Sequence, residues 1–176
     1  MPPAMTNKGW SHVSLGTLDM DRTRAFYEGV LGFKAVRCDI ITVKEGGQIR
    51  HVFFDTGQKQ LLAFMEPRGI PGTPVEFDGG LNRPLGMPDG VYHFAFEAGT
   101  HAELEQKRAE LIAKGVKVTP VVDHEWAKSI YFKDPNGILL EYSYITRQFT
   151  ADDGILQPRF EMSFRDESPI TDFRDR

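Results

Sequence analysis

The sequence predicts an α+β fold built from two copies of one βαβββ module. Strand-like and helix-like segments follow one another in the same order twice, and the two copies begin about eighty positions apart. A stretch rich in proline and glycine separates the copies. The chain of 176 residues has the length of one domain or of two small modules.

The first predicted module spans about residues 8–66. It opens with a strand over 10–15, in which the side chains alternate in character as in a half-buried strand. Asp19 and Asp21 are candidate N-caps of the helix that follows, and Gly32 suits the C-terminal cap of that helix. The remaining predicted elements of this module are three strands: 33–43, 48–56 and 60–66.

The second predicted module spans about residues 91–146. A strand over 91–96 leads into a helix that begins with a Ser/Thr-x-x-Glu capping box at Thr100 and Glu103. Gly115 ends this helix. The remaining predicted elements are three strands: 116–122, 127–132 and 138–145.

Two segments lie outside the predicted modules. Residues 67–90 contain five prolines and six glycines, so we expect a linker or a covering loop there. Residues 147–176 form a polar tail that we expect to pack over an edge or mouth of the fold. The apolar anchors of this tail are Ile155, Leu156, Phe160 and Phe164.

Composition and charge exclude several kinds of partner. Lysine and arginine number 21 against 25 aspartate and glutamate residues, the net charge is -4, and no basic run occurs. Nucleic acids and anionic membranes are therefore not expected as partners. No segment approaches the roughly 20 apolar residues of a membrane span, and the single cysteine, Cys38, cannot form an internal disulfide. We expect a cytoplasmic protein.

The turn between the last two predicted strands determines which side chains share a face. Pro135 suits the first central position of a type I turn, and Gly137 suits the αL residue of a G1 bulge. Counting outward from this three-residue loop places Tyr131 opposite Glu141, so a phenol and a carboxylate share one face. A two-residue loop would instead place Ile130 opposite Glu141.

The residue spacing in the second module resembles the signature of extradiol ring-cleavage dioxygenases. The signature runs through Val122-Asp123-His124, five residues, Ile130-Tyr131, two residues, Asp134-Pro135-Asn136-Gly137, three residues and Glu141. Residues 1–146 resemble the vicinal oxygen chelate superfamily, which also contains glyoxalase I, methylmalonyl-CoA epimerase and bleomycin-resistance proteins. The resemblance implies that the two modules pair into a curved, incomplete barrel around one metal site.

The same resemblance implies the metal ligands. In the superfamily they come from the first strand of each module and from the last strand of the second, where this chain has His12, His93 and Glu141. Two imidazoles and one carboxylate leave adjacent coordination positions open, as in non-haem Fe(II) oxygenases. Fe(II) is therefore the expected metal, and Mn, Zn, Ni or Co are the alternatives. By itself, each histidine is better explained as an ordinary hydrogen-bonded strand residue, but their equivalent positions in the repeat, together with Glu141, favour the metal site.

Many glyoxalase-like and epimerase-like members of the superfamily add a fourth ligand from the last strand of the first module. Ala63 falls at that position here, and strand alternation places Gln60 and Glu66 on the opposite face. A slip of one residue would turn Glu66 inward and favour the four-ligand isomerases and lyases. Gln60 also stands where two-module ring-cleaving enzymes carry a further histidine, for which His51 is a candidate substitute.

By resemblance, the expected function is a metal-dependent extradiol-type dioxygenase that cleaves a catechol-like aromatic substrate with dioxygen. His124 would act as an acid or base, and Tyr131 would hydrogen-bond the reacting oxygens; a solvated loop histidine and a packing tyrosine are the alternatives. The alternative functions are a glyoxalase, epimerase or lyase and a non-catalytic binding protein. The expected partners are a small molecule with vicinal oxygens and, in a homodimer, a second copy of the chain.

Overall fold

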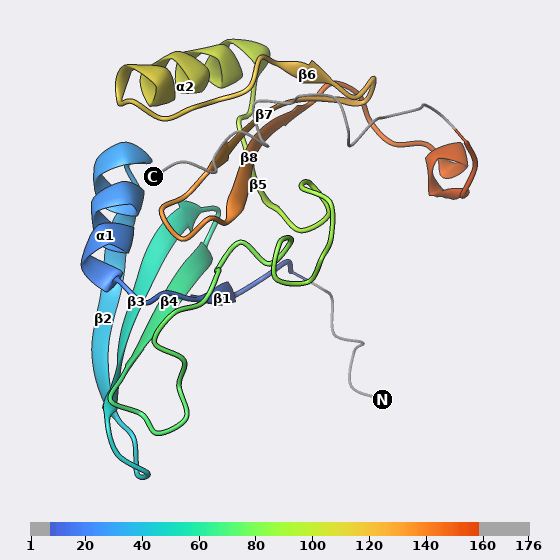
Figure 1. The fold of residues 1–176 in the computed structure, drawn as a ribbon. Coiled ribbons are helices and arrows are strands. Elements are labelled where there is room, and N and C mark those ends of the chain that lie inside the picture. Colours follow the sequence, from blue (N-terminus) through green and yellow to red (C-terminus); the bar gives the residue numbers. More distant parts are fainter. Residues whose placement is uncertain (1–7, 159–176) are drawn as a thin grey trace, which may run out of the picture. The chain divides into compact units, whose positions relative to one another are not determined.

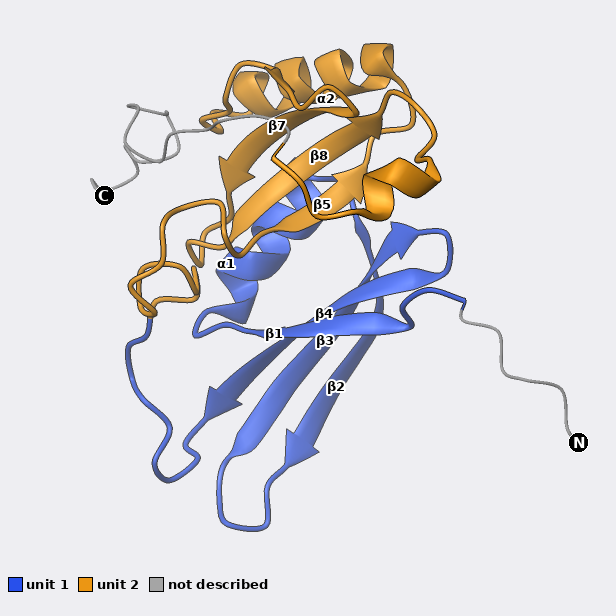
Figure 2. Ribbon diagram, turned by 90° about the vertical axis from the view of Figure 1, so that its right-hand side faces the viewer, with its two compact units in different colours: residues 1–77 blue, residues 78–176 orange. Residues whose placement is uncertain are grey.

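The structure, a computed structural model, describes residues 8–158 (Figure 1). The chain divides into two compact units, residues 1–77 and 78–176 (Figure 2). Two of the expected tail anchors, Phe160 and Phe164, lie outside the described residues. In the part of the chain that the structure describes, no helix is long and apolar enough to cross a membrane.

Unit 1 is an open four-stranded sheet with a helix packed on one face (Figure 1). Its elements are β1 (His12–Gly16), α1 (Met20–Arg24), η1 (Ala25–Val30), β2 (Lys34–Thr42), β3 (Gln48–Gly57) and β4 (Gln60–Arg68). The strand order is β1-β4-β3-β2; β1 runs parallel to β4, and the other neighbouring strands are antiparallel.

Aromatic packing holds the helix of unit 1 on its sheet. The ring of Tyr27 lies 4.9 Å from that of Phe64 and 5.4 Å from that of Phe54, measured between centroids, and all three side chains are buried. The helix begins as predicted, because the Asp19 carboxylate accepts a hydrogen bond from the backbone of Arg22 at 2.9 Å. Residues 25–30 then widen into a π-type turn.

Unit 2 repeats the βαβββ order. Its elements are β5 (Phe94–Glu97), α2 (His101–Ala113), β6 (Val122–Asp123), β7 (Ala127–Lys133), β8 (Leu139–Ile145) and η2 (Ala151–Gly154). The strand order is β5-β8-β7-β6, with β5 parallel to β8 and the other neighbouring strands antiparallel. Both sheets are mixed and open, so the predicted class of two βαβββ modules is confirmed.

The helix α2 covers one face of the second sheet (Figure 1). Leu104 and Leu111 of the helix are fully buried, and so are Ile130, Phe132 and Leu140 of the strands. Because side chains alternate along a strand, the odd-numbered residues of β7 and β8 project from the opposite face. The candidate site lies on that opposite face.

The predicted strand 116–122 is wrong for most of its length, since only Val122–Asp123 forms a strand. Pro120 has no backbone N–H and cannot donate to a ladder. Thr119 still holds the segment to β7, because its backbone N–H donates to the Tyr131 carbonyl at 3.0 Å and its hydroxyl accepts from the Tyr131 N–H at 3.0 Å. The segment is therefore fixed to the sheet without continuing the strand.

Candidate metal centre

The hairpin of β7 and β8 places Tyr131 and Glu141 side by side. The Asp134 N–H donates to the Ile138 carbonyl at 3.0 Å, and Gly137 adopts a φ of 84°, as the G1-bulge loop requires. Tyr131 is consequently the direct cross-strand partner of Glu141. The predicted register is confirmed.

His93 meets Glu141 at the start of the neighbouring strand. His93 directly precedes β5, which runs beside β8 with Ala95 opposite Glu141. The His93 Nε2 atom lies 3.1 Å from the Glu141 carboxylate, whose side chain is only 7% exposed. The Gly90 carbonyl accepts a hydrogen bond from the other ring nitrogen, Nδ1, at 2.7 Å. In a neutral ring this contact would place the proton on Nδ1 and leave the Nε2 lone pair for a metal, whereas in the protonated ring Nε2 donates to Glu141.

Each member of this pair favours the charged form of the other. The hydrogen bond to Glu141 raises the pKa of His93, against the opposing effect of burial. Burial alone would raise the pKa of Glu141, but hydrogen bonds from His93 and Ser129 outweigh it and hold that pKa below its usual value. Glu141 is therefore an ionised carboxylate at neutral pH, as a metal ligand must be.

The arrangement fits a divalent metal. Two ligand atoms that each lie about 2.1 Å from one ion at a right angle are about 3 Å apart, and the His93 and Glu141 atoms have this separation. A metal-binding histidine commonly donates its second N–H to a backbone carbonyl, as His93 does to Gly90. Imidazole and carboxylate together suit most first-row divalent ions.

Tyr131 links the ligand pair to His124. The Tyr131 hydroxyl lies 2.8 Å from His124 Nε2, and the ring of Tyr131 lies edge-on to that of His93 with 6.2 Å between centroids. Burial and the nearby charge of Glu141 raise the pKa of Tyr131, so the phenol keeps its proton. The structure thus brings His93, Glu141, Tyr131 and His124 together within unit 2.

His12, the other predicted ligand, belongs to unit 1. It opens β1 opposite Leu61 of β4, on the face of the sheet that α1 leaves free. Its ring packs edge-on against Phe53 at 5.6 Å, and its Nδ1 lies 3.1 Å from the Ser11 hydroxyl. Among residues 8–158, no three His, Cys, Asp or Glu side chains gather into a complete metal-binding group.

Glu66 projects toward the helix side of its sheet, as strand alternation predicts. Its carboxylate accepts the Met20 backbone N–H at 3.4 Å and pairs with the guanidinium groups of Arg50 and Arg68. Ala63 is fully buried and projects from the other face, the face of His12. The one-residue slip that would turn Glu66 inward does not occur.

His51 lies on the same free face of unit 1, opposite Met65 of β4. Its ring packs on Phe53 at 4.2 Å, and its Nε2 atom is buried without a hydrogen-bond partner in the described part of the chain. Burial lowers the pKa of His51 below its usual value. His51 is therefore a neutral imidazole near Phe53 and not a charged one.

Two residues that support the site were not anticipated from the sequence. Ser129 is fully buried two positions before Tyr131, and its hydroxyl hydrogen-bonds the side chains of both Tyr131 and Glu141. Asn82 is also buried, and its side-chain amide both donates to the Tyr92 carbonyl at 2.9 Å and accepts the Tyr92 N–H at 2.8 Å. These two hydrogen bonds of Asn82 fix the backbone of Tyr92, the residue before His93. The alternation that identified Tyr131 also places Ser129 on the site face, whereas no local pattern marks Asn82.

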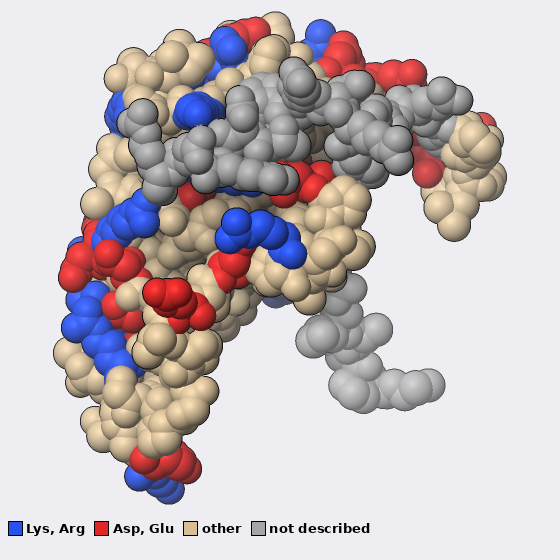
Figure 3. Space-filling model, in the orientation of Figure 1, with Lys and Arg blue, Asp and Glu red and all other residues tan. Residues whose placement is uncertain are grey.

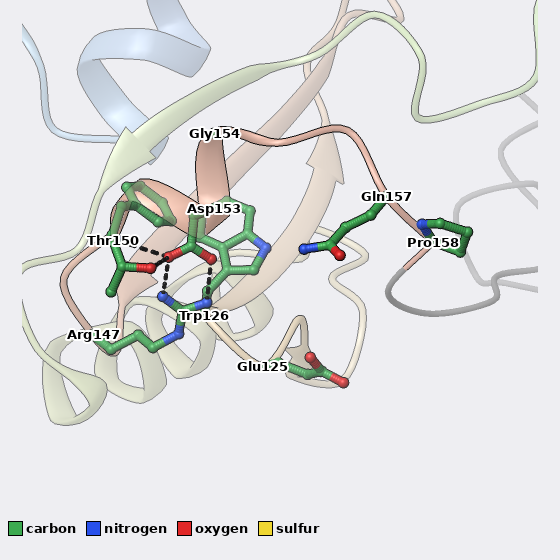
Figure 4. A pocket seen from close by; sticks show the side chains of 9 residues that line it. Glu125, Trp126, Arg147, Thr150, Asp153, Gly154, Gln157 and Pro158 are labelled. Carbon is green, nitrogen blue, oxygen red and sulfur yellow. Dashed lines mark hydrogen bonds and ion pairs between the residues drawn. The ribbon is translucent and has the colours of Figure 1, made fainter.

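A pocket of about 770 Å³ opens beside this cluster, between the turn at 125–126 and the segment 147–158 (Figure 4). Trp126 and Phe149 supply aromatic walls, and their ring centroids lie 5.3 Å apart. Arg147 and Asp153, which also line the pocket, form a two-pronged ion pair with N–O distances of 2.7 and 2.8 Å. On the face drawn in Figure 3, acidic and basic side chains of the described residues are interspersed.

Comparison with known families defines the class of protein. Residues 9–142 match the Glyoxalase/Bleomycin resistance protein/Dioxygenase superfamily. The match covers most of the chain, so the protein belongs to this superfamily, the vicinal oxygen chelate proteins. No curated protein sequence matches the chain.

Several solved structures share the fold. An integron cassette protein from the mobile metagenome of the Halifax Harbour sewage outfall is 26% identical, with a TM-score of 0.54 over 79% of this chain and 100% of its own. A lactoylglutathione lyase from Agrobacterium tumefaciens is 24% identical, with a TM-score of 0.52 over 82% and 96%. An antibiotic-binding protein from a Streptomyces species is 16% identical, with a TM-score of 0.56 over 81% and 100%.

Proposed function

We propose that this protein is a metal-dependent dioxygenase of the extradiol type that cleaves a catechol-like substrate. The observation that carries the proposal is the cluster on one face of unit 2, where a ligand pair adjoins an acid-base pair. His93 and Glu141 are 3.1 Å apart, and His124 and Tyr131 are 2.8 Å apart. Ring-opening chemistry needs both kinds of group close to one substrate.

The proposed ligands are His12, His93 and Glu141, and Fe(II) is the proposed metal, with Mn, Zn, Ni and Co as the other candidates. When bound, the metal supplies Lewis acidity, which lowers the pKa of a coordinated phenol, and open positions for vicinal oxygens and dioxygen. Both oxygen atoms would enter the ring-opened product, so no external reductant is consumed. The position of Glu66 supports this three-ligand set, because its carboxylate is engaged by two arginines.

The chain's own residues would manage the protons. His124 Nε2 would accept the proton of a substrate hydroxyl and later return it. The Tyr131 hydroxyl, which keeps its proton because its pKa is raised, would donate a hydrogen bond to a reacting oxygen. The contact between His124 Nε2 and the Tyr131 hydroxyl holds the two groups together, and a bound substrate would replace it as the partner of each.

Further parts of the proposal concern organisation and setting. We infer that residues 1–146 are one vicinal oxygen chelate domain, with modules over about 8–66 and 91–146 joined by the linker 67–90, and that 147–176 are a C-terminal tail. A homodimer is proposed because many members of the superfamily form dimers. The exposed thiol of Cys38, the single cysteine, suits a reducing compartment such as the cytoplasm.

Oxygen uptake tests the function directly. Protein reconstituted with Fe(II) is offered a panel of substituted catechols, beside His93→Ala and the control His101→Ala, which removes an exposed histidine of α2. We expect uptake and a yellow ring-opened product from the wild type and the control, and neither from His93→Ala. A protein that binds metal but consumes no oxygen with any catechol contradicts the dioxygenase and favours glyoxalase, epimerase or lyase chemistry. Absence of metal binding favours a non-catalytic binding protein.

A further inference from the structure

Aromatic rings connect the candidate metal centre to the pocket at the end of β7. The ring of His93 contacts that of Tyr131 at 6.2 Å, and Tyr131 contacts His124 at 6.1 Å. His124 in turn contacts Trp126 at 6.5 Å, and Trp126 contacts Phe149 at 5.3 Å. All five rings belong to unit 2. A series of ring contacts therefore runs from a proposed metal ligand to the pocket wall.

The pocket has the size of a small-molecule site. Its volume of about 770 Å³ lies within the roughly 300–1,000 Å³ typical of ligand pockets. Trp126 and Phe149 form apolar walls, and Phe149 is 57% exposed. In Figure 4 the side chain of Gln157 extends toward Trp126 across the opening. A flat apolar group placed here would cover aromatic surface that now faces solvent.

The charges that line the pocket disfavour an anion. The guanidinium of Arg147 is held by the Asp153 carboxylate at 2.7 and 2.8 Å. Asp153 is fixed further by the Thr150 backbone N–H, which donates to it at 2.7 Å. Since the Asp153 carboxylate neutralises Arg147, the aromatic walls of Trp126 and Phe149 favour an uncharged ligand group.

Hydrogen bonds hold the backbone around Trp126 in place before any ligand binds. Glu125 adopts a left-handed conformation with a φ of 68°, and its N–H donates to the Asp123 carboxylate at 2.9 Å. The Thr146 N–H donates to the Trp126 carbonyl at 2.9 Å, and the Thr146 hydroxyl donates to the Glu125 carbonyl at 3.2 Å. A wall held this way loses little conformational freedom when a ligand binds.

We propose that this pocket binds a flat, uncharged, apolar group of the substrate that is remote from its vicinal oxygens, and so selects fused-ring substrates over single rings. The inference rests on the proposed function in one respect, the placement of the vicinal oxygens at the His93 and Glu141 end. The remote group would lie against Trp126 and Phe149.

Binding to the metal-free protein provides the first test. Trp10→Phe changes an exposed residue of unit 1 and leaves Trp126 as the single tryptophan, so the quenching of its emission reports on the pocket. We expect dihydroxyanthracene with vicinal hydroxyls to quench this emission saturably, and Phe149→Ala to weaken binding at least tenfold. Ile112→Ala, at an exposed position of α2, should leave the affinity unchanged. An equal affinity in Phe149→Ala and its parent, or no saturable quenching, would overturn the proposal.

Turnover provides the second test and separates the two proposals. We expect Phe149→Ala to reduce kcat/KM for dihydroxyanthracene at least tenfold more than it reduces kcat/KM for catechol. Equal losses with both diols would show that the pocket does not select the substrate. If neither diol is oxidised while Phe149→Ala still weakens binding, the dioxygenase function fails and the pocket assignment is supported.

Discussion

The last strands of the two modules each carry a buried carboxylate, yet the two have different surroundings. Glu66 of β4 is 2% exposed and faces the helix, where Arg50 and Arg68 pair with it. Glu141 of β8 is 6% exposed and projects from the free face, where its partner is His93. Arginine keeps its charge at every accessible pH, whereas histidine gives up its proton near neutrality. The two arginine partners therefore give Glu66 a structural role, whereas the histidine partner leaves Glu141 able to bind the proposed metal.

The largest expected effect that distinguishes the two carboxylates is on metal affinity. Glu141→Gln removes the charged ligand atom and should weaken Zn(II) or Fe(II) binding by at least about 100-fold, while Glu66→Gln should leave it within about threefold of the wild type. Titration calorimetry on metal-free protein measures both affinities, and circular dichroism checks that each variant is folded. Equal losses in the two variants would remove the proposed distinction.

For the free energy of unfolding, we expect the substitution of Glu66 to have a larger effect than that of Glu141. Glu66→Gln leaves two guanidinium groups beside a neutral amide, so we expect the free energy of unfolding to fall by about 2–4 kcal/mol. Denaturation by urea gives this value. Asp21→Asn is a suitable control, because Asp21 also pairs with Arg50, at 2.9 Å, but its side chain is 76% exposed, so its substitution should cost much less than that of Glu66. A Glu66→Gln protein as stable as the control would show that the buried pair contributes little.

A smaller effect should follow from the hydroxyl that supports Glu141. Ser129→Ala removes the hydrogen bond to this carboxylate, and we expect metal affinity to fall about tenfold with the fold intact. Ser143→Ala tests the next contact outward, since the Ser129 hydroxyl lies 3.2 Å from that of Ser143, and should change the affinity less. If Ser129→Ala binds metal as tightly as the wild type does, the hydroxyl does not orient the ligand.

The dependence of stability on pH should sharpen the comparison further. Burial alone would raise the pKa of Glu66, but its arginine partners hold this pKa below the value in the unfolded chain. The ionised carboxylate therefore contributes stability at neutral pH, and this contribution is lost as the pH falls below about 5 through the folded-state pKa. Urea midpoints at several pH values should decline less steeply for Glu66→Gln than for the wild type. Parallel curves would assign the acid sensitivity to other groups.

The sequence was informative where local rules determine geometry. Gly137 permits the αL position of the three-residue loop, and that single requirement determines the pairing of Tyr131 with Glu141. Alternation along β4 likewise placed Ala63 and Glu66 on opposite faces. Both predictions needed only residues that are close together in the chain.

Other features escaped prediction because they depend on distant or irregular segments. The pocket is made by the turn at 125–126 and the segment 147–158, and neither is a long regular element. The π-type turn at 25–30 has no hydrophobic period that distinguishes it from an α-helix. The prediction of a strand over 116–122 rested on its apolar residues and did not take into account that Pro120 has no backbone N–H to donate. His12 corresponds to His93 in the repeat, and its role as a ligand stays a prediction.

The short β6 strand has a consequence for the unpaired edge of its sheet. An exposed strand edge presents free N–H and C=O groups on which another chain can pair, and long edges promote aggregation. Because Pro120 interrupts the segment, β6 offers only Val122–Asp123 as a regular edge strand. Pro120 thereby shortens the β6 edge at which another chain could pair with the sheet that carries the candidate site.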